Sequence, residues 1–142
     1  MTDSNFTIGF IGLGLIGGSI AKGIRRVFPN YTLIGMDENP DTIKSALEDG
    51  IIDSIATDCK TDFAECNYVF LCAPVQYNVM YLKDLKESIN KDCILTDVGS
   101  VKEEIHLKIE ELGMEECFIG GHPMVGSEKA GFSFSSDRLV EN

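Results

Sequence analysis

A histidine in a glycine-rich loop is the residue of this chain best suited to acid–base chemistry. His122, one of only two histidines, lies in the run GGHPMVGS at residues 120–127. The flanking glycines let a ligand approach the backbone closely. Histidine accepts a proton near neutral pH, which suits the oxidation of an alcohol, where the hydroxyl loses a proton while a hydride leaves the carbon that bears it. A structural loop histidine is the alternative interpretation of His122, whereas His106 is expected to be a partly exposed helical residue.

The second feature is a glycine fingerprint near the N-terminus. The run GLGLIG at residues 12–17 matches the pattern G-x-G-x-x-G, follows a predicted strand and opens a predicted helix. Gly12 would permit the tight turn, Gly14 would let a pyrophosphate approach the backbone, and Gly17 would let the helix pack close to the strand. A glycine-rich turn without a ligand is the alternative. Together, fingerprint and histidine predict a dehydrogenase.

An acidic residue at the end of the second predicted strand favours NAD over NADP. Asp37 lies 20 residues after Gly17, where a carboxylate accepts hydrogen bonds from the adenosine ribose and repels a 2′-phosphate. Glu38 adds to that repulsion. Asp37 could instead belong to the turn, but Asn39 and Pro40 already supply a turn and a helix cap.

Two further strand ends are expected to border the cofactor, because ligands of such sheets bind at the carboxyl ends of the strands. These are the runs CAP at residues 72–74 and DVGS at residues 97–100. Ser100 has a competing interpretation, since the run SVKE at residues 100–103 is a capping box. The predicted cofactor-contacting residues are Gly12, Gly14, Leu15, Ile16, Gly17, Asp37, Cys72, Ala73, Pro74, Asp97 and Ser100.

The elements that must position these residues alternate between short apolar strands and helical stripes. Strands are predicted at residues 6–11, 32–36, 51–56, 68–72, 93–98 and 117–119. Helices are predicted after the fingerprint up to Pro29, from Asn39 to Gly50, and along the stripes 75–89 and 101–112. This alternation predicts one α/β domain over residues 1–142, a doubly wound parallel sheet of the Rossmann type with strand order 3-2-1-4-5-6. The final segment closes no element, so we expect the chain to stop near an edge of its domain.

Composition narrows the class of protein. The 142 residues are 44% hydrophobic with a net charge of −11, and no apolar run approaches the ~20 residues that span a bilayer. A polar N-terminus without a basic flank predicts a soluble, cytoplasmic protein, and the negative charge argues against nucleic acid and membrane partners. The five cysteines form no C-x-x-C pair. They predict buried free thiols rather than a metal site or a catalytic cysteine.

Three motifs together resemble the prephenate/arogenate dehydrogenase family of tyrosine biosynthesis. They are GFIGLGLIGGS at residues 9–19, TDVGSVK at 96–102 and GHPMVGSEKAG at 121–131. The first is shared with many dehydrogenases, whereas the last two in this order are specific. The resemblance implies an NAD-binding domain followed by an all-helical domain, which forms a homodimer and completes the substrate pocket. That helical domain is expected to lie outside these 142 residues.

The resemblance also implies roles for individual residues. His122 would accept a hydrogen bond from the ring hydroxyl of the substrate, Ser100 would orient His122 beside the nicotinamide, and Glu128 would lie near the pocket entrance. The implied reaction is the oxidative decarboxylation of prephenate to 4-hydroxyphenylpyruvate with hydride transfer to NAD. Because cations for the substrate carboxylates would come from the helical domain, these residues alone are expected to bind NAD without turning over prephenate.

Three other interpretations stay open. Arogenate would serve in place of prephenate. The β-hydroxyacid dehydrogenases begin with a similar glycine run, but they rely on a lysine of their helical domain rather than on a His-Pro loop. A non-catalytic module that senses NAD would need no histidine facing the nicotinamide.

Overall fold

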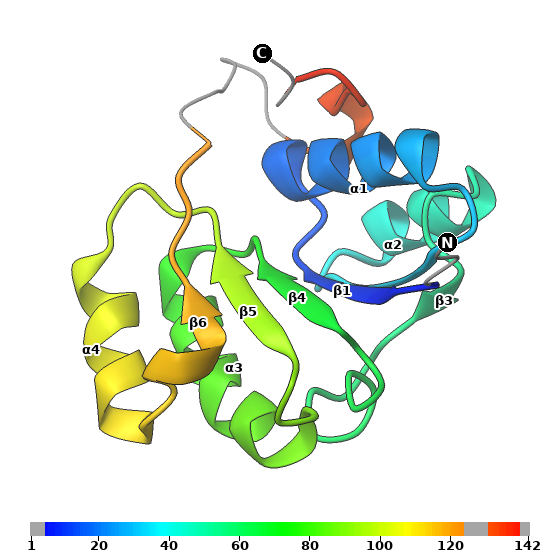
Figure 1. The fold of residues 1–142 in the computed structure, drawn as a ribbon. Coiled ribbons are helices and arrows are strands. Elements are labelled where there is room, and N and C mark those ends of the chain that lie inside the picture. The colour runs from blue at the N-terminus through cyan, green and yellow to red at the C-terminus, as the bar shows by residue number, and fades with distance from the viewer. Residues whose placement is uncertain (1–4, 124–130, 140–142) are drawn as a thin grey trace.

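The computed structural model describes residues 5–123 and 131–139, which form a six-stranded parallel sheet covered on both faces (Figure 1). The strands are ordered β3-β2-β1-β4-β5-β6, so the predicted doubly wound order is confirmed. Their bounds are β1 (Thr7–Ile11), β2 (Thr32–Met36), β3 (Ser54–Ile55), β4 (Tyr68–Leu71), β5 (Ile94–Asp97) and β6 (Phe118–Ile119). The carboxyl ends of β1, β4, β5 and β6 therefore share one edge of the sheet.

The edge strand β3 is shorter than the predicted run 51–56. Ile51 and Ile52 donate their amide hydrogens to the carbonyl of Ala46, with N···O distances of 3.0 and 3.3 Å, and so complete the end of the preceding helix. Pairing with β2 begins only at the Asp53 amide, which donates to Leu33. The apolar pair Ile51-Ile52 therefore serves the helix end rather than the sheet.

The helices lie on opposite faces of the sheet. Helices α1 (Leu15–Val27) and α2 (Pro40–Glu48) cover one face, and α3 (Val75–Ser88) and α4 (Glu103–Leu112) cover the other (Figure 1). Each pair encloses its own apolar core, with Phe10 and Leu33 fully buried on the α1 side and Leu71 and Leu95 on the α3 side. Two short 3₁₀ turns, η1 (Glu115–Cys117) and η2 (Phe132–Phe134), follow α4 and the segment beyond β6.

The predicted cap of α2 is confirmed, whereas the predicted capping box of α4 is wrong. Asn39 Oδ1 accepts hydrogen bonds from the amides of Asp41 at 2.9 Å and Thr42 at 3.5 Å, with Pro40 in the first helical position. Helix α4 begins only at Glu103, and no side chain caps it. The hydroxyl of Ser100 is therefore not used as a helix cap.

The segment after the undescribed residues 124–130 returns to the outer side of α1. Phe132 of η2 is buried, and its ring lies where a side chain on Gly18 would stand, 2.8 Å from an added Cβ. The amide of Ser136 donates to Ser19 Oγ at 3.0 Å. Lys22 donates to the carbonyl of Ser135 at 3.2 Å, and its ammonium lies 4.3 Å from the centre of the Phe132 ring. The C-terminal segment thus covers a face of α1 that small residues leave open.

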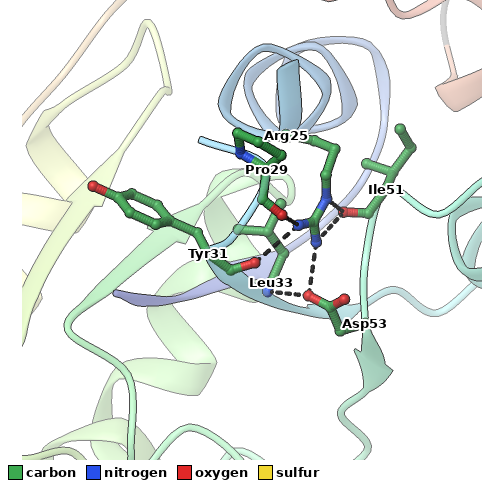
Figure 2. Close-up of polar contacts among 6 residues, drawn as sticks. All are labelled: Arg25, Pro29, Tyr31, Leu33, Ile51 and Asp53. Atoms are coloured by element: carbon green, nitrogen blue, oxygen red, sulfur yellow. Dashed lines mark hydrogen bonds and ion pairs between the residues drawn. The ribbon is translucent and has the colours of Figure 1, made fainter. Parts of the chain in front are cut away.

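An arginine ties together the amino edge of the sheet (Figure 2). The Arg25 guanidinium donates to the carbonyls of Pro29 at 3.0 Å, Tyr31 at 2.9 Å and Ile51 at 3.2 Å, and it pairs with Asp53 Oδ2 at 2.7 Å. The same Asp53 oxygen accepts from the Leu33 amide at the start of β2, at 2.8 Å. One guanidinium thereby joins the end of α1 to the chain that enters β2 and β3.

All five cysteines are free thiols. Cys59, Cys66 and Cys93 are buried as predicted, but Cys72 and Cys117 lie one residue outside their strands and are only half-buried. Burial raises the pKa of the Cys66 thiol from 9.0 to about 12.

Among the described residues, no helix is long and apolar enough to cross a bilayer, and no cluster of histidine, cysteine and carboxylate side chains has a metal-binding arrangement.

Candidate functional site

The glycine fingerprint forms a turn that only glycine allows. Gly12 has a positive φ of 94°, and an added Cβ would lie 2.6 Å from the amide nitrogen of Ala73. A Cβ on Gly17 would lie 2.2 Å from the carbonyl oxygen of Gly12, closer than real contacts permit. The turn therefore packs directly between the start of α1 and the end of β4, as the predicted roles of Gly12 and Gly17 require.

Gly14 differs from its neighbours because the protein itself leaves its side open. A Cβ built on Gly14 meets no atom within 4 Å, yet Gly14 lines a cleft at the carboxyl edge. Packing therefore does not explain a glycine at this position. Space for a ligand does.

The cleft has a volume of about 170 Å³ and lies between the fingerprint, the end of β2, the end of β4 and α3. Six of the predicted cofactor-contacting residues line it: Gly12, Gly14, Asp37, Cys72, Ala73 and Pro74. The remaining predicted residues are not among its lining residues: Leu15, Ile16, Gly17, Asp97 and Ser100. The structure thus brings the fingerprint and Asp37 to one cleft, and the end of β5 follows on the neighbouring strand, where Asp97 pairs with Leu71.

Asp37 holds the fingerprint in place as well as lining the cleft. Its Oδ2 accepts a hydrogen bond from the Leu13 amide at 2.8 Å, and its Oδ1 accepts from the Asn39 amide at 2.9 Å. Both the turn interpretation and the cleft position therefore apply to this side chain. Each carboxylate oxygen accepts more than one hydrogen bond, so Asp37 keeps acceptor capacity for a ligand.

Two tyrosines of α3, Tyr77 and Tyr81, also line the cleft, and sequence reasoning missed both. They are four residues apart, which places them on one face of the helix. Burial raises the pKa of the Tyr81 hydroxyl, and the nearby thiol of Cys59 and carboxylate of Glu38 raise it further. Tyr81 consequently stays a neutral hydrogen-bond donor beside an acidic rim. The i, i+4 spacing directly after Pro74 was the available signal.

Asn78 is a second residue that sequence reasoning missed. It is buried, and its side chain accepts from the Ala73 amide at 3.2 Å while donating to the carbonyls of Ala73 at 2.8 Å and Leu71 at 3.3 Å. These bonds fix the turn between β4 and α3. The wall of the cleft formed by residues 72–74 is therefore set by an amide within the first turns of α3.

A buried carboxylate organises the neighbouring part of the same edge. Asp97, at the end of β5, receives the Lys102 ammonium at 2.7 Å on each of its two oxygens, and its Oδ1 also accepts from the Gly121 amide at 3.2 Å. Lys102 donates in addition to the carbonyl of Gly121. The carboxylate of Asp97 is thus already engaged by protein groups.

The two residues predicted to do chemistry follow neighbouring strands at this edge. Ser100 lies beyond the end of β5 and His122 beyond the end of β6, and both are exposed. Within residues 5–123 and 131–139, neither side chain has a hydrogen-bond partner, so the predicted contact between Ser100 and His122 is not made in this structure. Glu128, the predicted pocket residue, lies outside the described residues.

Comparison with known proteins identifies relatives along the whole chain. Residues 20–142 match the family described as the nucleotide-binding domain of prephenate dehydrogenase. Prephenate dehydrogenase of Bacillus subtilis is 36% identical over 144 residues, covering 100% of this chain and 39% of that protein. Prephenate dehydrogenase of Lactococcus lactis is 38% identical, covering 93% of this chain and 38% of that protein. The chain thus spans about two fifths of the length of these relatives.

Solved structures agree with this result. Prephenate dehydrogenase of A. aeolicus, solved with hydroxyphenyl propionate and NAD⁺, superposes with a TM-score of 0.88 at 34% identity, covering 100% of this chain and 50% of that one. Arogenate dehydrogenase of Synechocystis superposes with a TM-score of 0.83, also at 34% identity, covering 94% of this chain and 46% of that one.

Proposed function

We propose that this chain, which belongs to the prephenate dehydrogenase family and matches the nucleotide-binding domain of that family, holds NAD for the oxidative decarboxylation of prephenate to 4-hydroxyphenylpyruvate. The observation that carries this proposal is the cleft at the carboxyl edge, which is lined both by Gly14, whose side no protein atom fills, and by Asp37. The A. aeolicus relative of the same family was solved with NAD⁺.

The residues of the cleft fit a dinucleotide. The fingerprint leads into α1, whose N-terminal amides and dipole favour a pyrophosphate. Asp37 would accept hydrogen bonds from the adenosine ribose, and together with Glu38 it would repel the 2′-phosphate of NADP. Tyr77 and Tyr81 would border the adenosine part from α3. NAD, when bound, supplies the acceptor for the hydride that leaves the carbinol carbon of the substrate.

The residues after β5 and β6 would act on the substrate. In this proposal His122 accepts the proton of the ring hydroxyl as the hydride leaves the carbon that bears this hydroxyl and passes to NAD. The ring carboxylate departs as carbon dioxide, the electrons of the broken bond complete the aromatic ring, and His122 returns the proton to the phenolate oxygen. Ser100 would orient His122 once the ligands are bound, since catalytic hydrogen bonds are often unmade without ligand. Formation of the aromatic ring provides much of the driving force, so the protein mainly positions the reactants.

Arogenate is the second candidate substrate, because a relative of comparable similarity is an arogenate dehydrogenase. For the whole protein we further propose a place in tyrosine biosynthesis, a cytoplasmic location and a homodimer formed through a helical segment beyond the matched region. Glu128 would lie near the pocket entrance.

The first experiment is calorimetric titration of the 142-residue chain with NAD and, separately, with NADP. We expect NAD to bind and NADP to bind at least tenfold more weakly. Gly14→Ala should abolish NAD binding without loss of stability, because its Cβ meets no protein atom and would stand in the ligand space. Gly23→Ala, within α1 and away from the cleft, is the control and should keep NAD binding; because its Cβ would lie 3.2 Å from the carbonyl oxygen of Asp137, the stability of both variants is measured as well. Equal binding of NAD by wild type and Gly14→Ala would overturn the cofactor site.

The second experiment tests the chemistry. The 142 residues replace the matching segment of the Bacillus subtilis relative in a chimera, and turnover of prephenate is measured with and without His122→Asn. The substitution should lower kcat by roughly 10²–10⁴ while NAD affinity is kept. If the protein only senses NAD, His122→Asn should change neither the NAD affinity nor any measured rate. The 142-residue chain alone is expected to bind NAD without turnover.

A further inference from the structure

We propose that Asp97 and Lys102 form a clamp that positions the His122 loop, defined as residues 120–123. The clamp makes Lys102 a positioning residue and not a cation for the carboxylates of the substrate. This inference rests on the proposed role of His122 as proton acceptor, and it extends that role to two residues that do not touch the reacting atoms.

The clamp joins three segments that are separate in the sequence. Asp97 ends β5, Lys102 immediately precedes α4, and Gly121 follows β6. The Asp97 carboxylate receives the Lys102 ammonium on both oxygens and the Gly121 amide on Oδ1. Because Lys102 also donates to the Gly121 carbonyl, the backbone of Gly121 is bound on both its amide and its carbonyl side.

The hydrogen-bonding capacity of Lys102 is fully used by these contacts. An ammonium has three N–H donors, and Lys102 directs them to the two oxygens of Asp97 and to the carbonyl of Gly121. No donor is left for a substrate carboxylate unless the clamp opens. Opening would leave Asp97 as an unpaired carboxylate that is only 2% exposed, which is costly.

Steric contact reinforces the electrostatic one. A Cβ on Gly121 would lie 2.7 Å from the backbone carbonyl oxygen of Asp97, so the loop passes directly over the end of β5. A Cβ on Gly120 would lie 3.3 Å from His106 Nε2. Two glycines would otherwise leave the loop free to move, and His122 follows them directly. The clamp thus restricts a loop that its two glycines would otherwise leave free to move.

The test measures order in the loop of the 142-residue chain. Backbone ¹⁵N relaxation gives order parameters for the amides of Gly121 and His122 in wild type and in Lys102→Met. We expect values near 0.85 in wild type and below about 0.6 in the variant. The matched control is Lys108→Met, because Lys108 lies on α4, has the same 27% side-chain exposure as Lys102 and pairs with Glu111 instead. Its loop should keep the wild-type values.

A second variant guards against unfolding. Lys102→Met leaves a buried charge, whereas Asp97→Leu/Lys102→Met removes the whole clamp and leaves none. In the double variant the order parameters of Gly121 and His122 should fall while those of the sheet stay unchanged. A well-ordered loop in both variants would overturn the clamp.

Turnover links the clamp to the chemistry. In the chimera with the Bacillus subtilis relative, the double variant should lower kcat about 100-fold with the KM for NAD within twofold. A raised KM for prephenate with unchanged kcat would instead assign Lys102 to the substrate and overturn the inference. If His122→Asn has no effect on turnover, the proposed function fails, while the order parameters still decide whether the clamp exists.

Discussion

Two carboxylates tie strands to neighbouring segments, one at each edge of the sheet. At the amino edge, Asp53 accepts the amide of Leu33 and pairs with Arg25 (Figure 2). At the carboxyl edge, Asp97 accepts the amide of Gly121 and pairs with Lys102. In both places the cation also donates to backbone carbonyls. The hydrogen-bond pattern is similar at the two edges, but the more deeply buried partner of the ion pair is the cation at one edge and the carboxylate at the other.

At the amino edge the carboxylate is half in water and the cation is covered, whereas at the carboxyl edge the carboxylate is the covered partner. Side-chain exposure is 50% for Asp53 and 18% for Arg25, against 2% for Asp97 and 27% for Lys102. Arg25 spreads planar donors over three carbonyls, as a structural joint requires. Lys102 serves one buried charge beside a loop that carries a histidine. The same pattern of ion pair and backbone hydrogen bonds therefore joins structural segments at one edge and holds the His122 loop at the other, so the pattern by itself does not indicate a function.

The largest expected effect comes from removing the cation at the carboxyl edge. Lys102→Met should lower the free energy of unfolding by about 3–5 kcal/mol, because it leaves the buried Asp97 carboxylate without its partner. Urea denaturation measures this loss. Asp97→Leu/Lys102→Met should recover most of it, since no buried charge is left. Equal stability of the single and double variants would show that an unpaired Asp97 carboxylate carries no special cost, and the two edges would then not differ in the effect of burial.

A smaller loss is expected at the amino edge. Arg25→Met should cost about 1–3 kcal/mol, because three backbone carbonyls lose a charged donor while Asp53 stays hydrated. The same urea experiment applies, and calorimetry should find NAD affinity unchanged within twofold. Lys44→Met, which breaks an exposed pair with Glu48 on α2, is the control and should change stability by less than about 0.5 kcal/mol. Loss of NAD binding in Arg25→Met would contradict the purely structural role of that edge.

Alkaline pH should weaken the amino edge further, where Cys66 and Cys93 precede β4 and β5. Burial raises the pKa of the Cys66 thiol from 9.0 to about 12 and that of Cys93 to about 11. Above pH 9 the unfolded chain loses these protons while the folded chain keeps them, so stability falls as the pH rises from 9 to 11 and is unaffected by these thiols below 9. We expect a loss of about 1.4 kcal/mol per thiol at pH 10. Thermal unfolding followed by circular dichroism should give a shallower pH dependence for Cys93→Ala.

The smallest effect is expected from neutralising the exposed carboxylate. Asp53→Asn should change stability by about 0.5 kcal/mol, because the half-exposed ion pair is screened and the amide oxygen still accepts from Leu33. The Asp97→Asn variant, measured beside it, should lose several times more. Similar losses at the two positions would show that burial does not set the difference between the edges.

The elements of the fold were predictable because their signals are local. Alternating apolar runs and helical stripes predicted all six strands in their spatial order, and Asn39 with Pro40 predicted the start of α2. Six residues of the cleft followed as well, because a fingerprint, an acid at a strand end and a run closing the next strand are positional patterns. The predicted β3 was too long because Ile51 and Ile52 bond to Ala46 instead.

The parts that escaped prediction depend on contacts between distant segments. The pattern at residues 100–103 predicted a cap by Ser100, but Lys102 is held by Asp97 and α4 starts at Glu103. A four-residue pattern contains no information about that competing partner. Asn78 escaped for the same reason, since only the folded turn brings its amide to Leu71 and Ala73. The sequence therefore predicted the fingerprint glycines and Asp37 of the cleft, but neither the two tyrosines of α3 that line it nor Asn78, which fixes its wall.

The contact between Ser136 and Ser19 has a consequence for the order of folding. It joins residues 117 positions apart, so α1 stays without its cover until residue 136 has been synthesised. At about 5–20 residues per second, the ribosome leaves this helix face waiting for several seconds. The fingerprint and its helix are among the first segments made, yet their packing is among the last to be completed. During synthesis, the fingerprint and the helix that it opens are therefore made long before the segment that covers the Gly18 and Ser19 face of α1.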